Sequence, residues 1–217
     1  IWDIAFDPAG SQIAFCVRKN RTDYSVVSNG VLWDNTFQYA WRPCFVNNGS
    51  SVVAPVRQGG SWMLFKDDAP FWKDRFKQLW HVTTHNGTGK LAAVVSNAYG
   101  KWSVSENQKT WNLPCDTMIS DLRYSADGSA LTAVYKHQGY WDAAVNGKPW
   151  GLKADKLWTP VTSEDAKYSA ARMEKDGKYF LIVNGNVYGQ AFDQVFDPVI
   201  SPENDKVLLK TIQDGVY

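Results

Sequence analysis

The sequence predicts an all-β protein, a β-propeller of four-stranded blades with a repeat of about 39 residues, and three observations support this. A frame of aromatic residue, strand, turn and aromatic residue recurs along the chain. A second series of aromatic residues recurs at nearly the same interval. Each copy also contains another turn, followed by an apolar stretch of strand character.

The frame is seen in "YSVVSNGVLW", "WSVSENQKTW", "WDAAVNGKPW" and "YFLIVNGNVY". Its first aromatic residues are separated by 38, 40, 39, 38 and 38 residues, at Tyr24, Trp62, Trp102, Trp141, Tyr179 and Tyr217. The copy "WMLFKDDAPF" fits with Asp67 and Asp68 in the turn and Phe71 as the closing aromatic residue. Asn and Gly accept the positive φ of tight hairpin turns, so each frame reads as a hairpin.

The second series has a constant step of 39 residues at Trp2, Trp41, Trp80, Ile119 and Trp158, and Phe196 falls one residue short of the next position. Turns such as "SADG" and "HNGTG" follow about eight residues later. Helical repeats of similar length do not fit the Gly, Asn and β-branched content of each copy. Each blade is therefore predicted to run from an inner strand with the second series to a short outer strand.

Residues 1–217 are predicted to form a single β-propeller domain of five nearly complete repeats and a partial sixth. Either the first strands complete the last blade of a closed ring, or further residues follow Tyr217 in the natural protein. We expect the second arrangement, a longer parent chain with six to eight blades. Trp141 and Trp150, on either side of one turn, are predicted to pack between blades.

Composition narrows the function classes. The formal net charge of +1 disfavours a nucleic-acid partner, and no stretch approaches the roughly 20 apolar residues of a membrane span. The opening "IWDIAFDPAG" has no signal-peptide pattern, so the chain as given is predicted to be soluble. Its three cysteines form no haem-binding or cluster-binding motif, and we expect small buried residues and no cofactor.

No metal site or catalytic motif is predicted. His81 and His85 lie on a predicted strand, where their rings would be about 13 Å apart, too far to share an ion. Hydrolysis of a glycoside would need two facing carboxylates, and the inner strands offer only scattered candidates, Asp3, Asp121 and Asp197. We therefore do not expect an enzyme.

Several aromatic residues in predicted loops are not explained by the repeat: Phe37, Tyr39, Trp72, Phe76, Tyr99 and Tyr140. Large exposed aromatic groups often mark contact surfaces. Partner binding is predicted for Trp72, which lies in an irregular charged segment, and for Phe76, Tyr99 and Tyr140. The alternative for Trp72 is packing against the neighbouring blade.

The turns in "SADGSALTAV" and "SPENDKVLL" resemble those of bacterial WD40-like propeller repeats, whereas the Trp-Asp pairs do not occupy the positions of true WD40 units. With 11 tryptophans and "VNGKPW"-type hairpins, the chain resembles the TmcD-type, tryptophan-rich propeller subunits of the transmembrane tetraheme cytochrome c complex of sulfate-reducing bacteria. The resemblance covers the whole chain in repeat style and has no site motif, so it assigns no functional residues.

This resemblance implies a non-catalytic scaffold for protein–protein interaction, an accessory electron transfer complex subunit without a cofactor. It would lie in the cytoplasm, peripheral to the inner membrane, with cytochrome b, iron-sulfur and multihaem cytochrome c subunits as partners. The alternative is a periplasmic or secreted propeller that binds or hydrolyses a peptide or glycan in its central channel.

Overall fold

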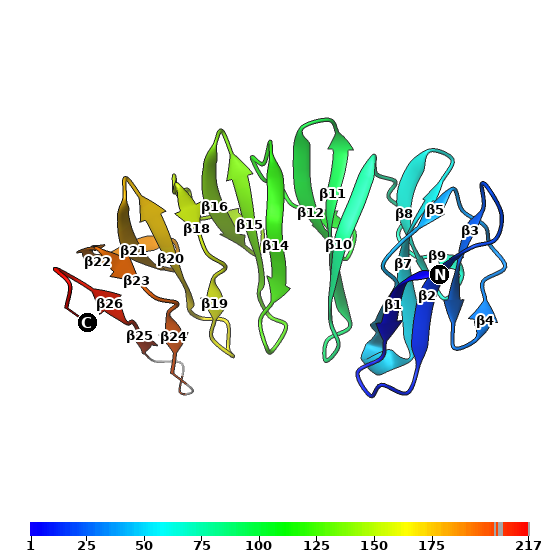
Figure 1. Ribbon diagram of the computed structural model, residues 1–217, viewed down its shortest axis with the longest axis horizontal. Coiled ribbons are helices and arrows are strands. Elements are labelled where there is room, and N and C mark those ends of the chain that lie inside the picture. The colour runs from blue at the N-terminus through cyan, green and yellow to red at the C-terminus, as the bar shows by residue number, and fades with distance from the viewer. Residues whose placement is uncertain (202, 204–205, 217) are drawn as a thin grey trace. The chain divides into compact units, whose positions relative to one another are not determined.

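The computed structural model describes residues 1–201, 203 and 206–216, and its regular structure is almost entirely β (Figure 1). Within these residues there is no α-helix, and the only helical element is the short 3-10 helix η1 (Asn47–Gly49). Antiparallel strands form successive sheets of four in chain order, with the inner strand broken in two of them. The predicted fold class, a β-propeller of four-stranded blades, is confirmed.

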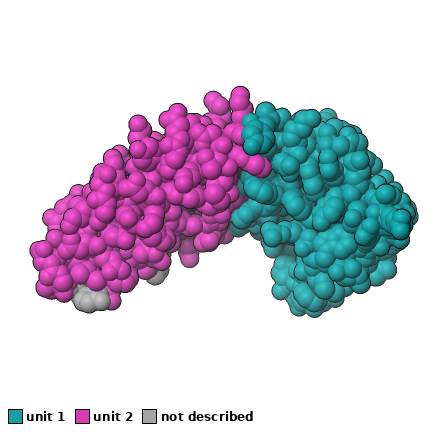
Figure 2. Space-filling view, turned by 45° about the horizontal axis from the view of Figure 1, so that its top comes forward, with its two compact units in different colours: residues 1–99, 104–110 teal, residues 100–103, 111–217 magenta. Residues whose placement is uncertain are grey.

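The chain divides into two compact units, residues 1–99 with 104–110 and residues 100–103 with 111–217 (Figure 2). That all 217 residues form one domain stays a prediction. No described helix has the length and apolar character needed to cross a membrane.

The first three sheets follow one another from the N-terminus. The first has the strand order β1 (Trp2–Phe6), β2 (Ile13–Arg18), β3 (Tyr24–Ser28) and β4 (Val31–Leu32). The second has the order β5 (Tyr39–Ala40), β7 (Ser51–Gln58), β8 (Ser61–Lys66) and β9 (Ala69–Pro70), with β6 (Cys44–Val46) also paired to β7. The third has the order β10 (Gln78–His85), β11 (Lys90–Ala98), β12 (Lys101–Glu106) and β13 (Lys109–Thr110).

The remaining sheets lie in the second unit. The fourth has the order β14 (Met118–Tyr124), β15 (Leu131–His137), β16 (Tyr140–Val145) and β17 (Lys148–Pro149). The fifth has the order β18 (Lys156–Leu157), β20 (Ser169–Lys175), β21 (Lys178–Val183) and β22 (Asn186–Phe192), with β19 (Val161–Thr162) also paired to β20. Two short pairs follow, β23 (Gln194–Val195) with β26 (Thr211–Ile212) and β24 (Val199–Ile200) with β25 (Val207–Leu208).

The inner strand of each repeat is irregular just after its residue of the second series. In the first three repeats the residue that follows has a positive φ, of 52° at Asp3, 39° at Arg42 and 48° at His81, again at steps of 39 residues. The pairing register shifts at this point in β1 and β10, while the second sheet splits its inner strand into β5 and β6. The repeat therefore includes a β-bulge, a feature that re-aims side chains and bends a strand.

The outer hairpin of every repeat is fixed by one side chain. The first central turn residue has a φ between 46° and 50° in all five copies, and the second is also left-handed, which defines a type I′ turn. The side-chain oxygen of the first turn residue accepts a hydrogen bond of 2.8–3.1 Å from the N–H at the start of the second strand. These pairs are Asn29 with Ile13, Asp67 with Val52, Asn107 with Leu91, Asn146 with Leu131, and Asn184 with Ser169.

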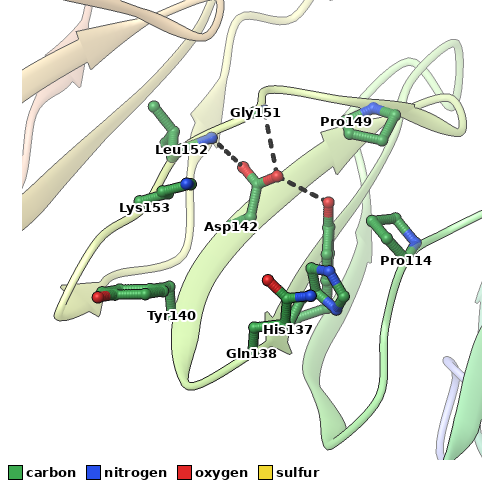
Figure 3. A pocket seen from close by; sticks show the side chains of 10 residues that line it. Pro114, His137, Gln138, Tyr140, Asp142, Pro149, Gly151, Leu152 and Lys153 are labelled. Atoms are coloured by element: carbon green, nitrogen blue, oxygen red, sulfur yellow. Dashed lines mark hydrogen bonds between the residues drawn. The ribbon is translucent and has the colours of Figure 1, made fainter.

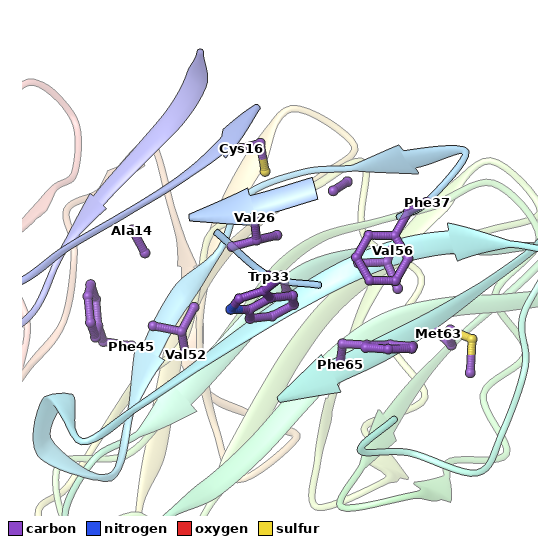
Figure 4. Packing of buried hydrophobic residues seen from close by; sticks show 12 residues of the cluster. Ala14, Cys16, Val26, Trp33, Phe37, Phe45, Val52, Val56, Met63 and Phe65 are labelled. Atoms are coloured by element: carbon purple, nitrogen blue, oxygen red, sulfur yellow. The ribbon is translucent and has the colours of Figure 1, made fainter. Parts of the chain in front are cut away.

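The core lies between neighbouring sheets. In the first unit, Trp33 packs with Val26 of the first sheet and with Val52 and Phe65 of the second (Figure 4). In the second unit, Trp141 and Trp150 pack against a cluster that includes Met173 and Ile182 of the next sheet, and this confirms their predicted role in packing between blades. The cysteines belong to this interior, and burial raises the pKa of the Cys16 and Cys44 thiols to about 12.

The turn glycines of the fourth and fifth sheets pack directly on the tryptophan that closes the preceding repeat. A Cβ added to Gly147 would lie 3.1 Å from the ring of Trp111, and one added to Gly185 would lie 3.0 Å from the ring of Trp150. Where the second turn residue is not glycine, its side chain bonds to the chain after the preceding sheet. Asp68 Oδ2 accepts from the Asp34 N–H at 2.7 Å, and Gln108 Oε1 accepts from the Lys73 N–H at 2.9 Å. The outer turns of the second to fifth sheets are thus held against the preceding repeat.

We predict that Asn146→Ala lowers the free energy of unfolding by about 2 kcal/mol, because the Leu131 N–H loses its acceptor and alanine disfavours a positive φ. Asn146→Asp keeps the acceptor, as Asp67 does naturally in the second sheet, and serves as the matched control. Denaturant titration of the three proteins measures the difference. If alanine and aspartate gave the same stability within about 0.5 kcal/mol, the turn side chain would have no such role.

Candidate functional site

Trp72 and Phe76 do not lie on the surface as expected. Each is 2% exposed and belongs to the core between the second and third sheets, beside Leu64 and Leu79. The alternative explanation for Trp72, packing against the neighbouring blade, describes its position. In this structure neither ring is available to a partner, so the surface prediction is wrong for these two residues.

Both residues occupy repeat positions that the sequence analysis missed. Trp72 belongs to a series with a step of 39 residues at Trp33, Trp72, Trp111 and Trp150, and Phe76 to another at Phe37, Phe76, Cys115 and Ala154. Each member of the series that contains Phe76 forms a bridge with the aromatic residue near the start of the third strand, such as Trp62 with Phe76. The segment from Asp67 to Trp72 is one residue longer than the corresponding segment of the other copies. Phe71 therefore falls where the sequence frame predicts the closing aromatic residue, but its side chain is exposed.

Tyr99 and Tyr140 do lie on the surface. Tyr99 is fully exposed in the turn between β11 and β12, and Tyr140, 45% exposed, begins β16 after the corresponding turn of the fourth sheet. Both residues therefore occupy the hairpin between the second and third strands of their own sheet. Their predicted role in partner binding remains a prediction.

Tyr140 lines a cavity of about 200 Å³ in the second unit (Figure 3). Pro114, Pro149 and Leu152 give it an apolar lining, and His137, Gln138 and Lys153 add polar groups. His137 Nδ1 lies 3.0 Å from Asp116 Oδ2, and the Gln138 N–H also donates to Asp116. The backbone bond from Gln138 is the main reason that the pKa of Asp116 lies below its usual value.

Asp142 holds one wall of this cavity in place. Its carboxylate accepts hydrogen bonds from the Tyr135 hydroxyl at 2.7 Å and from the N–H groups of Gly151 and Leu152 at 3.1 and 3.0 Å (Figure 3). Ser25 occupies the corresponding position in the first sheet, where its hydroxyl donates to the Trp33 carbonyl. Asp142 therefore holds the connecting chain, and the cavity has the character of a shallow apolar pocket that can receive a side chain.

A second cavity, of about 340 Å³, lies in the first unit. Its aromatic lining consists of Tyr39, Trp41 and Trp62, which we call the aromatic corner. The rings of Trp41 and Trp62 stack with centroids 4.7 Å apart and planes 23° apart. Tyr39 stands at 87° to Trp41, with a centroid distance of 6.2 Å. Two aromatic surfaces therefore meet nearly at a right angle.

Polar side chains complete the second cavity, at Gln38, Arg57, Lys77 and Gln78. Gln38 Oε1 accepts a hydrogen bond from the Gly60 N–H at 2.8 Å, which fixes the orientation of the amide. Arg57 and Lys77 are exposed, and neither forms an ion pair or a side-chain hydrogen bond within the described residues. Sequence analysis missed this site because its residues come from separate segments and form no motif.

Each of the three acidic residues considered for catalysis already has a hydrogen-bond or ion-pair partner. Asp3 accepts from the Arg42 N–H at 2.8 Å, Asp121 accepts from the Thr159 hydroxyl at 2.7 Å, and Asp197 pairs with Arg172 at 2.8 Å. His85 lies 2.9 Å from the Thr88 hydroxyl. In the part of the chain that the structure describes, no group of three His, Cys, Asp or Glu residues could hold a metal ion.

No protein-family model and no curated protein matches the sequence. Solved structures do match. A crystal structure of the eukaryotic initiation factor has a TM-score of 0.53 and 12% identity over 96% of this chain and 60% of its own. The Dos1 propeller has a TM-score of 0.50 and 13% identity over 98% and 64%. TolB from Acinetobacter baumannii has a TM-score of 0.48 and 15% identity over 84% and 51%.

The chain thus spans between half and two thirds of the length of these three structures. At identities this low the likeness concerns the fold alone. The Dos1 structure is itself described as a propeller, and its match over nearly the whole chain agrees with the repeated four-stranded sheets. The class of protein that these observations define is a β-propeller.

We predict that Tyr135→Phe makes stability less sensitive to alkaline pH. Burial, and secondarily the bond to Asp142, raise the pKa of Tyr135 above its usual value of 10.0. A raised folded-state pKa gives stability that is complete below the unfolded pKa and is lost as the pH rises above it. Denaturant titrations from pH 8 to pH 11 should therefore show the native protein losing stability faster than the variant above about pH 10. Parallel losses would show that Tyr135 is not buried as described.

Proposed function

We propose that the protein is a non-catalytic scaffold that binds protein partners through the hairpins between the second and third strands. The observation that carries this proposal is Tyr140, an exposed aromatic residue beside a preformed cavity lined by Pro114, Pro149 and Leu152. Tyrosine in a pocket with an apolar lining is typical of residues that dominate interface energies. Tyr99 presents a second exposed ring at the same kind of hairpin.

Rigid hairpins suit this role. The Asp116 carboxylate accepts from the Gln138 N–H at 3.0 Å, and this bond fixes the turn that precedes Tyr140. A preorganised turn loses little conformational entropy on binding, so more of the contact energy appears as affinity. The cavity beside Tyr140 offers the apolar surfaces of Pro114, Pro149 and Leu152, which can accept an apolar side chain of a partner.

The specific setting that we propose is an accessory subunit of a membrane-associated electron-transfer complex, in the cytoplasm and peripheral to the inner membrane. The partners would be cytochrome b, iron-sulfur and multihaem cytochrome c subunits. The support for this setting is the resemblance of the tryptophan-rich repeats to TmcD-type propellers. In this role the chain contributes contact surface, and the redox groups belong to its partners.

Purification of the tagged protein from native membranes in mild detergent tests this proposal, with subunits identified by mass spectrometry and haem measured by absorption. We expect cytochrome and iron-sulfur subunits to accompany the chain. Tyr140→Ser should lower the haem recovered per chain at least about fivefold, because a truncated interface anchor costs about 1 kcal/mol or more, and Tyr99→Ser should act in the same direction.

Tyr168→Ser is the matched control, since Tyr168 is also exposed but lies in the turn before β20, between the first and second strands of its sheet. A colourless chain recovered alone would contradict the electron-transfer setting. Recovery of the same partners with all three variants would contradict the assignment of the interface to the Tyr99 and Tyr140 hairpins.

A further inference from the structure

The cavity at the aromatic corner has a chemistry unlike that of the cavity at Tyr140. Tyr39 is 39% exposed, Trp41 is half-buried, and Trp62, stacked on Trp41, is 7% exposed. The corner is thus supported from within by Trp62 and offers Tyr39 and Trp41 to a ligand. An aromatic surface of this kind favours a ligand with an apolar face, such as the C–H face of a ring.

The polar groups of this cavity are mainly hydrogen-bond donors. A guanidinium and an ammonium have donors and no acceptor, and Arg57 and Lys77 supply one of each. The Gln38 amide directs its NH₂ group to further partners, because its oxygen already accepts from Gly60. A ligand that fits must therefore be rich in acceptors.

The charges that line the cavity further favour an anionic ligand. Two cations line the cavity, and no carboxylate is among its lining residues. Neither cation has an ion-pair partner in the described residues, so an anionic ligand would not have to displace an existing contact. Arginine binds carboxylates in a bidentate geometry, with hydrogen bonds about twice as strong as neutral ones.

We propose that the aromatic corner with Arg57 and Lys77 is a binding site for an acidic sugar, a hexuronic acid residue. The apolar face of the sugar ring lies on the aromatic corner, the carboxylate binds Arg57 and Lys77, and the hydroxyl groups bind the amides of Gln38 and Gln78. A volume of about 340 Å³, at the lower end for ligand pockets, suits a ligand of one or two rings.

Two other ligand classes fit less well. An apolar peptide side chain would cover the aromatic corner but leave the amides and cations without acceptors, which costs affinity. A nucleic acid would need a broad basic surface, and the net charge of the chain is +1. The proposal concerns a small ligand, and it goes beyond the scaffold function without depending on it.

Calorimetric titration of the intact protein with an α-1,4-linked galacturonate trimer tests the proposal, with the neutral galactose trimer as the comparison ligand. We expect the acidic trimer to bind and the neutral one to bind at least about tenfold more weakly, because the neutral trimer lacks the carboxylates that form charge-assisted hydrogen bonds with Arg57 and Lys77. Arg57→Gln and Lys77→Gln should each weaken the acidic trimer by a similar factor. Both side chains are exposed and unpaired, so these variants should fold normally.

Arg75→Gln is the matched control, since Arg75 is an exposed arginine of the first unit that does not line the cavity. Tyr39→Phe keeps the ring and should keep binding, whereas Tyr39→Ser should lose it. Absence of heat with the acidic trimer at millimolar concentration would overturn the proposal. So would equal binding of the neutral trimer, unchanged binding by Arg57→Gln and Lys77→Gln, or binding of an acidic leucine-containing peptide or of AMP in place of the sugar.

Discussion

The architecture depends on one hydrogen bond repeated five times, from the N–H at the start of the second strand to the side chain of the turn between the third and fourth strands. The same turn residue also returns its own N–H to the carbonyl of that second-strand residue, as Asn146 does with Leu131 at 2.9 Å. Three strands are thereby fixed in register at one end of each sheet. A short polar side chain that tolerates positive φ is needed for both tasks, and Asn and Asp meet this need.

This bond has consequences for packing between sheets. Because the turn is fixed at Asn146, Trp150, four residues later, packs into the core beside the next sheet. The turn of that next sheet then places Gly185 against the same ring. In this pair of sheets the local turn geometry and the packing between sheets therefore support one another, as expected of a sequence whose native contacts are mutually consistent.

The hairpins between the second and third strands do not share one turn side chain, unlike the outer hairpins. Their composition changes from copy to copy, from the pair Gly59 and Gly60 to Tyr99 with Gly100 and to Gln138 with Gly139. Function is commonly carried by such variable loops on a rigid scaffold. Both proposed sites are built here: the cavity at Tyr140 borders one of these hairpins, and the aromatic corner includes Trp62, which follows another.

The repeat, the hairpin turns and the packing role of Trp141 and Trp150 could be predicted because each rests on local rules of spacing and backbone conformation. Trp72 was wrongly predicted to lie on the surface because one extra residue follows the turn at Asp67 and Asp68. Phe71, and not Trp72, therefore fitted the frame of the other copies. Phe76 was misplaced because the series to which it belongs changes from aromatic residues to Cys115 and Ala154, so only its spacing reveals it. The aromatic corner could not be predicted, since Arg57 meets Tyr39 only through strand pairing, and Lys77 joins them from the segment before β10 of the next sheet.

Amide hydrogen exchange measured by NMR tests the central claim most directly, at the N–H groups of Ile13, Val52, Leu91, Leu131 and Ser169. If the turn side chains hold each sheet, these five amides should exchange at least about tenfold more slowly than solvent-exposed turn amides. They should also behave alike, because each has the same kind of acceptor. Exchange at the rate of unprotected amides in most copies would contradict the account and leave the outer hairpins without their proposed anchor.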